Sequence, residues 1–120
     1  MAILIGFQSC SDSRLYPNSD SDKAYLRDVE RAFISVSAGI RAYKREVEKL
    51  PDSVETLDLR GYVELEPEMR IGWAWKLEVN NNGHLSIEAV SNTLAPVGKD
   101  LKLIYDYTTE KWKRPYKFNK

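Results

Sequence analysis

Apolar residues recur along residues 22–50 with alternating gaps of three and four. They are Leu26, Val29, Phe33, Val36, Ile40, Tyr43, Val47 and Leu50. This spacing places all of them on one side of an α-helix, so the pattern predicts one long amphipathic helix over residues 22–50. Asp20 or Ser21 is a suitable N-cap, and Pro51 is expected to end the helix.

A line of small residues runs beside this apolar stripe. It comprises Ser35, Ser37, Ala38, Gly39 and Ala42. Small side chains let another backbone come close, whereas Gly39 by itself costs a helix about 1 kcal/mol relative to alanine. A packing role therefore explains Gly39 well, and the neighbour is either a sheet of the same chain or a helix of another chain.

The segment after the long helix combines short elements with helix-breaking residues. Residues 52–57 have a pattern typical of a short helix, which Gly61 is expected to end. Residues 62–66 alternate weakly between apolar and polar side chains. This alternation predicts a strand ended by Pro67, with a turn at residues 68–69.

The clearest strand pattern covers residues 70–79. One face would carry Ile71, Trp73, Trp75, Leu77 and Val79. Strict alternation with aromatic and β-branched residues predicts a half-buried strand. Residues 80–83, Asn-Asn-Asn-Gly, suit a tight reversal because Asn-Gly accepts positive φ at low cost. Residues 84–90 alternate again, so the two segments predict an antiparallel hairpin.

The remaining residues repeat this combination of strand and turn. Residues 91–100 contain proline and glycine and are expected to form a loop. Residues 101–107 alternate like a strand, residues 108–110 suit a turn, and residues 111–120 predict a last strand around Trp112.

Taken together, these elements predict one domain of the α+β class. Residues 1–21 form an apolar N-terminal tail followed by a Ser/Asp-rich loop, and residues 22–120 form the domain. The long helix is expected to lay its apolar stripe on one face of an antiparallel sheet of about four strands over residues 58–120. The apolar start, Ile3 to Phe7, fits either a strand or packed tail, or the remnant of an export segment.

Composition narrows the possible functions without choosing among them. With 18 basic and 18 acidic residues, the chain has no overall attraction to nucleic acid or anionic membranes. The single cysteine, Cys10, excludes an internal disulfide, and a single histidine, His84, argues against a zinc site. The sequence contains no apolar run long enough to span a bilayer.

Few residues have the pattern of a catalytic or binding site. His84 follows a hairpin turn and reads as a solvated residue, and Cys10 in a serine-rich loop reads as incidental or as a reactive or lipid-bearing thiol. Residues 64–68 hold three glutamates around a proline, which fits a solvated strand edge better than a carboxylate pair. The basic and aromatic tail, residues 111–120, fits an edge strand guarded by lysines or a surface for single-stranded nucleic acid.

Two segments near the end of the long helix resemble the type IV pilins and pseudopilins. They are Ile40-Arg41-Ala42-Tyr43-Lys44 and Leu50-Pro51-Asp52-Ser53-Val54-Glu55-Thr56-Leu57. In that family a long N-terminal helix ends in a tyrosine-containing turn and a proline-led segment, and an antiparallel sheet packs on the helix. The resemblance follows the order of elements over roughly residues 24–89 and implies a pilin-like fold.

The chain departs from that family at its N-terminus and in its cysteines. Family members have a Gly-Phe cleavage site followed by a long apolar segment with a glutamate at its fifth position. Here Gly6-Phe7 is followed by polar residues, and Ser11 stands where the glutamate is expected. The resemblance therefore implies a globular domain without the transmembrane half of its helix, either trimmed or the C-terminal chain of a split pilin. The family's usual disulfide loop cannot form.

The resemblance implies a non-enzymatic structural subunit of a filament at the cell envelope or outside the cell. Its partners would be other subunits or a short transmembrane-helix chain, with no cofactor, metal or nucleic acid, and with membrane contact only indirect. The predicted interface comprises Ile3, Leu4, Ile5, Phe7, Ser35, Ala38, Gly39, Ala42, Lys113 and Arg114. Charge complementarity between the glutamates of residues 64–68 and the basic tail would set the register of the subunits.

Two other function classes stay open. A chain of this size without catalytic motifs also fits a small cytoplasmic protein-binding module, such as a toxin immunity protein. A small enzyme or a nucleic-acid binder is the third class, and the empty motif search disfavours the enzyme.

Overall fold

The computed structural model describes residues 19–116, and it begins with the long helix α1, Asp20–Val47. The Oγ atom of Ser19 accepts a hydrogen bond from the N–H of Asp22 at 3.1 Å, so the N-cap is Ser19 and not Asp20 or Ser21. The helix ends before Pro51, since Glu48 adopts φ 67° and donates its N–H to the carbonyl of Lys44. This left-handed cap satisfies a terminal carbonyl, so the predicted end at Leu50 is three residues too late.

The apolar stripe of α1 forms one wall of the core, as predicted. Six of its residues are buried: Leu26, Val29, Phe33, Val36, Ile40 and Tyr43. Val47 packs at the margin of the core, whereas Leu50 lies beyond the helix and is 37% exposed. The stripe therefore continues as far as the helix does and no further.

Two short helices separate α1 from the sheet. α2 spans Val54–Leu59, where a short helix was predicted, and Ser53 caps it. α3 spans Pro67–Gly72, where a strand end and a turn were predicted. The prediction was wrong here because proline fits the first turn of a helix as well as it ends a strand. The preceding residues 62–66 have no regular secondary structure and join no strand of the described sheet, so the strand predicted there is wrong.

The sheet is an antiparallel meander of four strands. They are β1 (Trp73–Val79), β2 (Leu85–Ser91), β3 (Lys102–Asp106) and β4 (Lys111–Lys113). The predicted hairpin is confirmed, with Val79 opposite Leu85 and Gly83 at φ 80° in the turn. β1 begins at Trp73 and not at Arg70, because α3 takes up the residues before it. The sheet therefore covers residues 73–113 and not 58–120.

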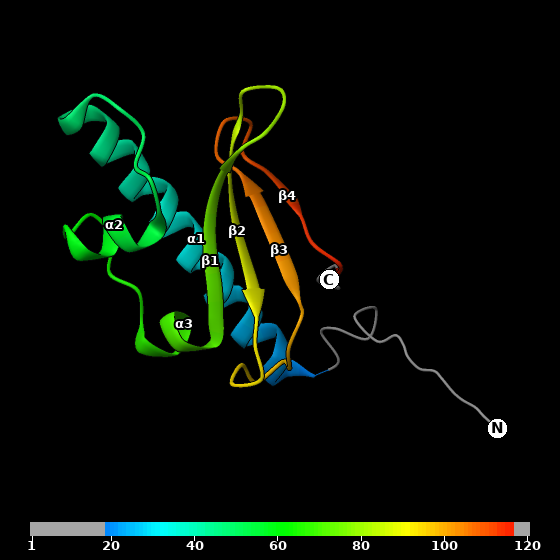
Figure 1. The fold of residues 1–120 in the computed structure, drawn as a ribbon. Helices are drawn as coiled ribbons and strands as arrows, with labels where there is room; N and C mark the ends of the chain where they lie inside the picture. The colour runs from blue at the N-terminus through cyan, green and yellow to red at the C-terminus, as the bar shows by residue number, and fades with distance from the viewer. Residues whose placement is uncertain (1–18, 117–120) are drawn as a thin grey trace.

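Helix and sheet form two layers (Figure 1). The sheet stands in front of α1 in this view, and α2 and α3 lie beside β1. Phe33 of α1 sits against two tryptophans of the sheet, with ring centroids 4.9 Å from Trp75 and 5.2 Å from Trp112. The α+β architecture, with one long helix packed on a four-stranded antiparallel sheet, is thus as predicted.

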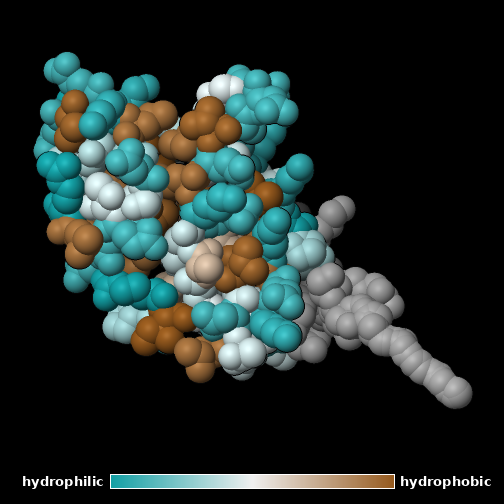
Figure 2. Space-filling view, viewed as in Figure 1, coloured by the Kyte–Doolittle hydropathy of each residue, from teal (hydrophilic) through white to brown (hydrophobic). Residues whose placement is uncertain are grey.

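No described helix covers the other face of the sheet. Figure 2 shows it from the same side as Figure 1, with hydrophilic residues predominating and hydrophobic ones scattered between them. Its charged side chains pair with one another, since Lys102 Nζ lies 3.9 Å from Glu88 and Lys76 Nζ lies 3.8 Å from Glu78. A polar face with internal pairing is what a sheet presents to water.

Candidate functional site

On the flank that faces residues 62–69, the backbone of α1 packs closely against another segment of the chain. A Cβ atom built at Gly39 would lie 2.8 Å from the carbonyl oxygen of Tyr62, which is closer than real side chains come. Gly39 is therefore buried against the segment of the same chain that follows α2. We call this side of the helix the loop flank.

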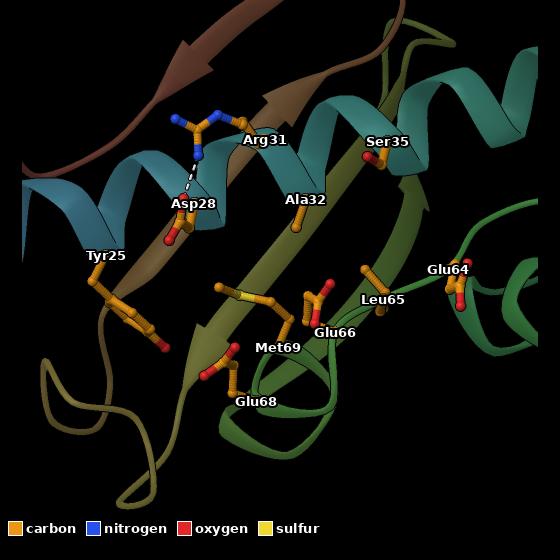
Figure 3. Close-up of a pocket in the computed structure, with 10 residues that line it drawn as sticks. All are labelled: Tyr25, Asp28, Arg31, Ala32, Ser35, Glu64, Leu65, Glu66, Glu68 and Met69. Carbon is orange, nitrogen blue, oxygen red and sulfur yellow. Dashed lines mark hydrogen bonds and ion pairs between the residues drawn. The ribbon is translucent and has the colours of Figure 1, made fainter.

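A groove opens on the loop flank between the first half of α1 and residues 64–69 (Figure 3). Its volume is about 420 Å³, and Ala32, Leu65 and Met69 supply apolar side chains to it. Four carboxylates and one guanidinium complete the lining: Asp28, Glu64, Glu66, Glu68 and Arg31. The groove is therefore acidic over an apolar base.

The charges around this groove are only partly compensated. Arg31 forms an ion pair with Asp28, one turn away on the same helix. Glu64, Glu66 and Glu68 form no hydrogen bond or ion pair with any described side chain, and we call these three residues the acidic rim. An acidic rim over an apolar base can hold a basic, partly apolar group through Coulomb attraction and burial.

One end of the groove is held rigidly by aromatic contacts. The Tyr25 hydroxyl accepts a hydrogen bond from Nε1 of Trp73 at 2.8 Å, and Nε1 of Trp75 donates to the Met69 carbonyl at 2.9 Å. Burial raises the pKa of Tyr25, and the nearby Glu68 carboxylate adds to this effect. These bonds fix α3 and β1 to the helix, so the groove is preformed.

The side of α1 that faces away from the sheet carries a second regular stripe. It consists of Arg27, Arg31, Ile34, Ala38, Arg41 and Arg45, all exposed, and we call it the outer stripe. The gaps of four and three place these side chains along one line of the helix. Ile34 is 47% exposed at the centre of this line. The outer stripe is thus basic at both ends with a small apolar centre.

The opposite flank of α1 is closed by the chain's C-terminal residues. Arg114 Nη1 lies 2.7 Å from Oε2 of Glu30, and the Tyr116 hydroxyl donates to the same oxygen at 2.7 Å. The Arg114 guanidinium also stands over the Trp112 and Tyr116 rings, 5.3 and 5.7 Å from their centroids. We call this side of the helix the tail flank.

The predicted interface residues fall into different surroundings. Ile3, Leu4, Ile5 and Phe7 lie outside the described residues, as does Cys10. Ser35 lines the acidic groove, Ala38 belongs to the outer stripe, and Ala42 is half-buried. Gly39 is buried against Tyr62, Lys113 is exposed on β4, and Arg114 is bound to Glu30. The structure therefore brings Ser35 and the glutamates of the rim together, but not Arg114.

His84 occupies the end of the hairpin, as expected from its place in the sequence. Its Nδ1 atom lies 3.3 Å from the Asp106 carboxylate. Burial opposes ionisation of Asp106, but hydrogen bonds from the N–H groups of Thr109 and Thr108 outweigh it and lower the Asp106 pKa. Within residues 19–116, no group of three or more His, Cys, Asp or Glu side chains is placed to hold a metal ion.

The arginines of the outer stripe are missing from the predicted interface, although their spacing can be read in the sequence. The gaps that mark the buried stripe also separate these arginines, but a charged line on a helix ordinarily indicates only a solvated face.

None of the helices within the described residues combines the length and apolarity needed to cross a bilayer.

Comparison with known proteins identifies no relative. No model of a known protein family, no curated protein and no solved structure matches the chain.

Proposed function

We propose that this protein is a non-enzymatic structural subunit, the globular domain of a pilin-like filament. The order of elements supports this proposal: a long helix, a short proline-led helix and an antiparallel meander that packs on the long helix. The same order characterises the family that the segments around Ile40 and Pro51 resemble. Localisation at the cell envelope or outside the cell is part of the same proposal.

One observation carries the proposal: within the described residues, the side of α1 that faces away from the sheet is exposed. A helix of 28 residues is about 42 Å long. The exposed outer stripe runs along most of this length, with Ile34 and Ala38 at its centre. A long exposed helix side with a small residue beside an apolar one suits lateral packing against another helix.

The mode of assembly follows from the asymmetry of the surface. The outer stripe and the groove adjoin at Arg31 but otherwise lie on different sides of α1, so contacts between unlike surfaces leave one of each free at the ends of an array. Such head-to-tail contacts generate open filaments unless the rotation between subunits closes a ring. The apolar centre would supply burial and the surrounding charges would orient the subunits.

Sedimentation velocity and negative-stain electron microscopy of the full chain test this proposal. We expect a concentration-dependent series of oligomers, alone or after addition of a short apolar helical peptide, and we expect Ile34→Asp to abolish it. Leu59→Asp is the matched control, because Leu59 of α2 is 87% exposed but lies off α1. A chain that stays monomeric under both conditions would contradict the filament proposal.

The acidic groove favours a second candidate, a binding module for a basic protein such as a toxin. Its lining has four carboxylates to one guanidinium over an apolar base. This candidate predicts a stoichiometric complex with a basic partner that ends at one-to-one, weakens at high salt and is insensitive to Ile34→Asp. The same sedimentation experiment therefore separates the two functions.

A further inference from the structure

The acidic rim has no partner among the described residues, and this distinguishes it from other charged groups of the molecule. On the uncovered face of the sheet, Glu88 and Glu78 each pair with a lysine. On the tail flank, Glu30 binds Arg114 and Tyr116. The rim thus concentrates negative charge without a described partner next to the apolar side chains of the groove.

The outer stripe presents the complementary charge. Four of its six residues are arginines, and its acidic neighbour Asp28 is taken by Arg31. Arg45 has no hydrogen bond or ion pair to any residue that the structure describes. Arginine suits such a surface because its planar guanidinium binds carboxylates through two parallel hydrogen bonds.

The two surfaces adjoin at Arg31, which belongs to the outer stripe and also lines the groove, where it pairs with Asp28. Figure 3 shows the Arg31 side chain projecting from α1 on the side away from Glu66 and Glu68. The rest of the outer stripe lies further round the helix, for example Ile34, two positions after Ala32 of the groove. Each position turns the side-chain direction by about 100°. The rigid helix therefore holds the stripe beyond Arg31 away from the acidic rim of the same molecule.

We propose that the outer stripe of α1 is a docking surface for the acidic rim of a second copy of this chain. Arg41 and Arg45 of one copy bind the acidic rim of the next, and Ile34 enters the apolar part of its groove. This inference rests on the proposed filament function and names the two surfaces that meet in it. It differs from the sequence-based prediction, in which the basic tail was the partner of the same glutamates.

Charge exchange between two variants of the full chain tests this pairing. The first variant, Ala38→Glu with Arg45→Glu, removes most of the positive charge of the stripe, and the second, Glu64→Lys with Glu66→Lys, makes the rim basic. Each alone should associate at least about tenfold more weakly than the unaltered chain at an ionic strength near 0.01 M, because the attraction is weakened in the first variant and becomes repulsion in the second. An equimolar mixture should form one-to-one complexes again, since the unaltered stripe of the second variant then meets the unaltered rim of the first.

Three outcomes separate this inference from the filament proposal. If the unaltered chain forms long oligomers that neither variant weakens, the pairing is wrong and the filament proposal stands. If both variants weaken association and the mixture restores it, but the unaltered chain forms only closed dimers, the pairing stands and the filament proposal fails. If the unaltered chain is monomeric at low ionic strength, both with and without the apolar helical peptide, both fail. Circular dichroism of each variant confirms that the exchanged charges leave the fold intact.

Discussion

The two flanks of α1 are held by the same chain in opposite ways. On the tail flank, Glu30 accepts from Arg114 and Tyr116, and the charge of the helix is neutralised where it meets the C-terminal residues. On the loop flank, the helix meets bare backbone, since Gly39 touches the carbonyl of Tyr62. The loop flank also carries the acidic rim, whose three carboxylates pair with nothing in the described chain.

This difference shows which charged groups of the surface are already paired in the folded chain. A glutamate that is bound to arginine and tyrosine has its charge and hydrogen-bonding capacity largely satisfied. Unpaired carboxylates remain available to a basic surface of a second molecule. The comparison therefore places a stabilising contact on the tail flank, whereas our proposal places association on the loop flank, and the predictions below test that division.

Removing the largest fully buried side chain, that of Phe33, should have the largest effect on stability. Phe33 is buried between Trp75 of β1 and Trp112 of β4. Phe33→Ala should lower the free energy of unfolding by about 3–5 kcal/mol, because it removes apolar contacts and leaves a cavity. Urea denaturation measures this loss. Ile34→Ala is the control and should change stability by less than about 0.5 kcal/mol.

Filling the contact on the loop flank should be the next most damaging change. Alanine in mid-helix is ordinarily better than glycine by about 1 kcal/mol. Gly39→Ala should instead cost about 1–3 kcal/mol, because its Cβ would be forced against the Tyr62 carbonyl. Ala38→Gly, one residue away and exposed, should cost about 1 kcal/mol from propensity alone. A stabilised Gly39→Ala protein in urea denaturation would show that the backbones separate easily.

Two tyrosine–glutamate bonds allow the flanks to be compared directly. Tyr116 donates to Glu30 at 2.7 Å on the tail flank, and Tyr62 donates to Glu46 at 2.8 Å near the end of the loop flank. Glu30→Gln should cost about 1–2 kcal/mol, since it removes a part-buried charge that also binds Arg114. Glu46→Gln lies on the exposed surface and should cost less than about 0.5 kcal/mol. Equal losses in urea denaturation would remove the distinction between the flanks.

Alkaline pH should weaken the tail flank through Tyr116. Burial and the hydrogen bond to Glu30 raise the pKa of Tyr116 above its ordinary value of 10.0. A raised pKa adds stability that is complete below pH 10 and is lost as the pH rises above it, because the unfolded chain then releases this proton first. Tyr25 and Tyr105 shift in the same direction, so the difference between the unaltered chain and Tyr116→Phe isolates the contribution of Tyr116. An identical pH slope above pH 10 for both proteins would contradict this account.

Neutralising the acidic rim should have the smallest effect on folding. Glu64→Gln with Glu66→Gln should change the free energy of unfolding by less than about 0.5 kcal/mol, because both side chains are exposed and bind no described residue. The same variant should lose its self-association at low ionic strength. A large loss of stability would show that the rim is part of the fold and not an association surface.

Local patterns were sufficient for most of the architecture. The three-four spacing of α1 specifies one helix, and the alternation over residues 70–79 predicts the strand that becomes β1. The alternation was wrong at its start, where Ile71 lies in α3, and Ile71 and Val79 are each 58% exposed. The turn at Asn80 to Gly83 specified the hairpin through its tolerance of positive φ. Where two elements share the same local signal, the sequence was ambiguous. Pro67 suited a strand end and a helix start equally, and residues 62–66 alternate because Val63 and Leu65 enter the core, although no strand pairs with them.

Association surfaces depend on distances that no local pattern contains. The sequence indicated a packing role for Gly39 and an interface role for Arg114. In the fold both residues make contacts within the chain, Gly39 with Tyr62 and Arg114 with Glu30. It also decided which charges stay unpaired within the described residues, because Arg31, which lines the groove with Glu64 and Glu66, is paired with Asp28. Periodicity determines which residues share each side of a helix, whereas only tertiary packing determines which of those sides is buried by the same chain.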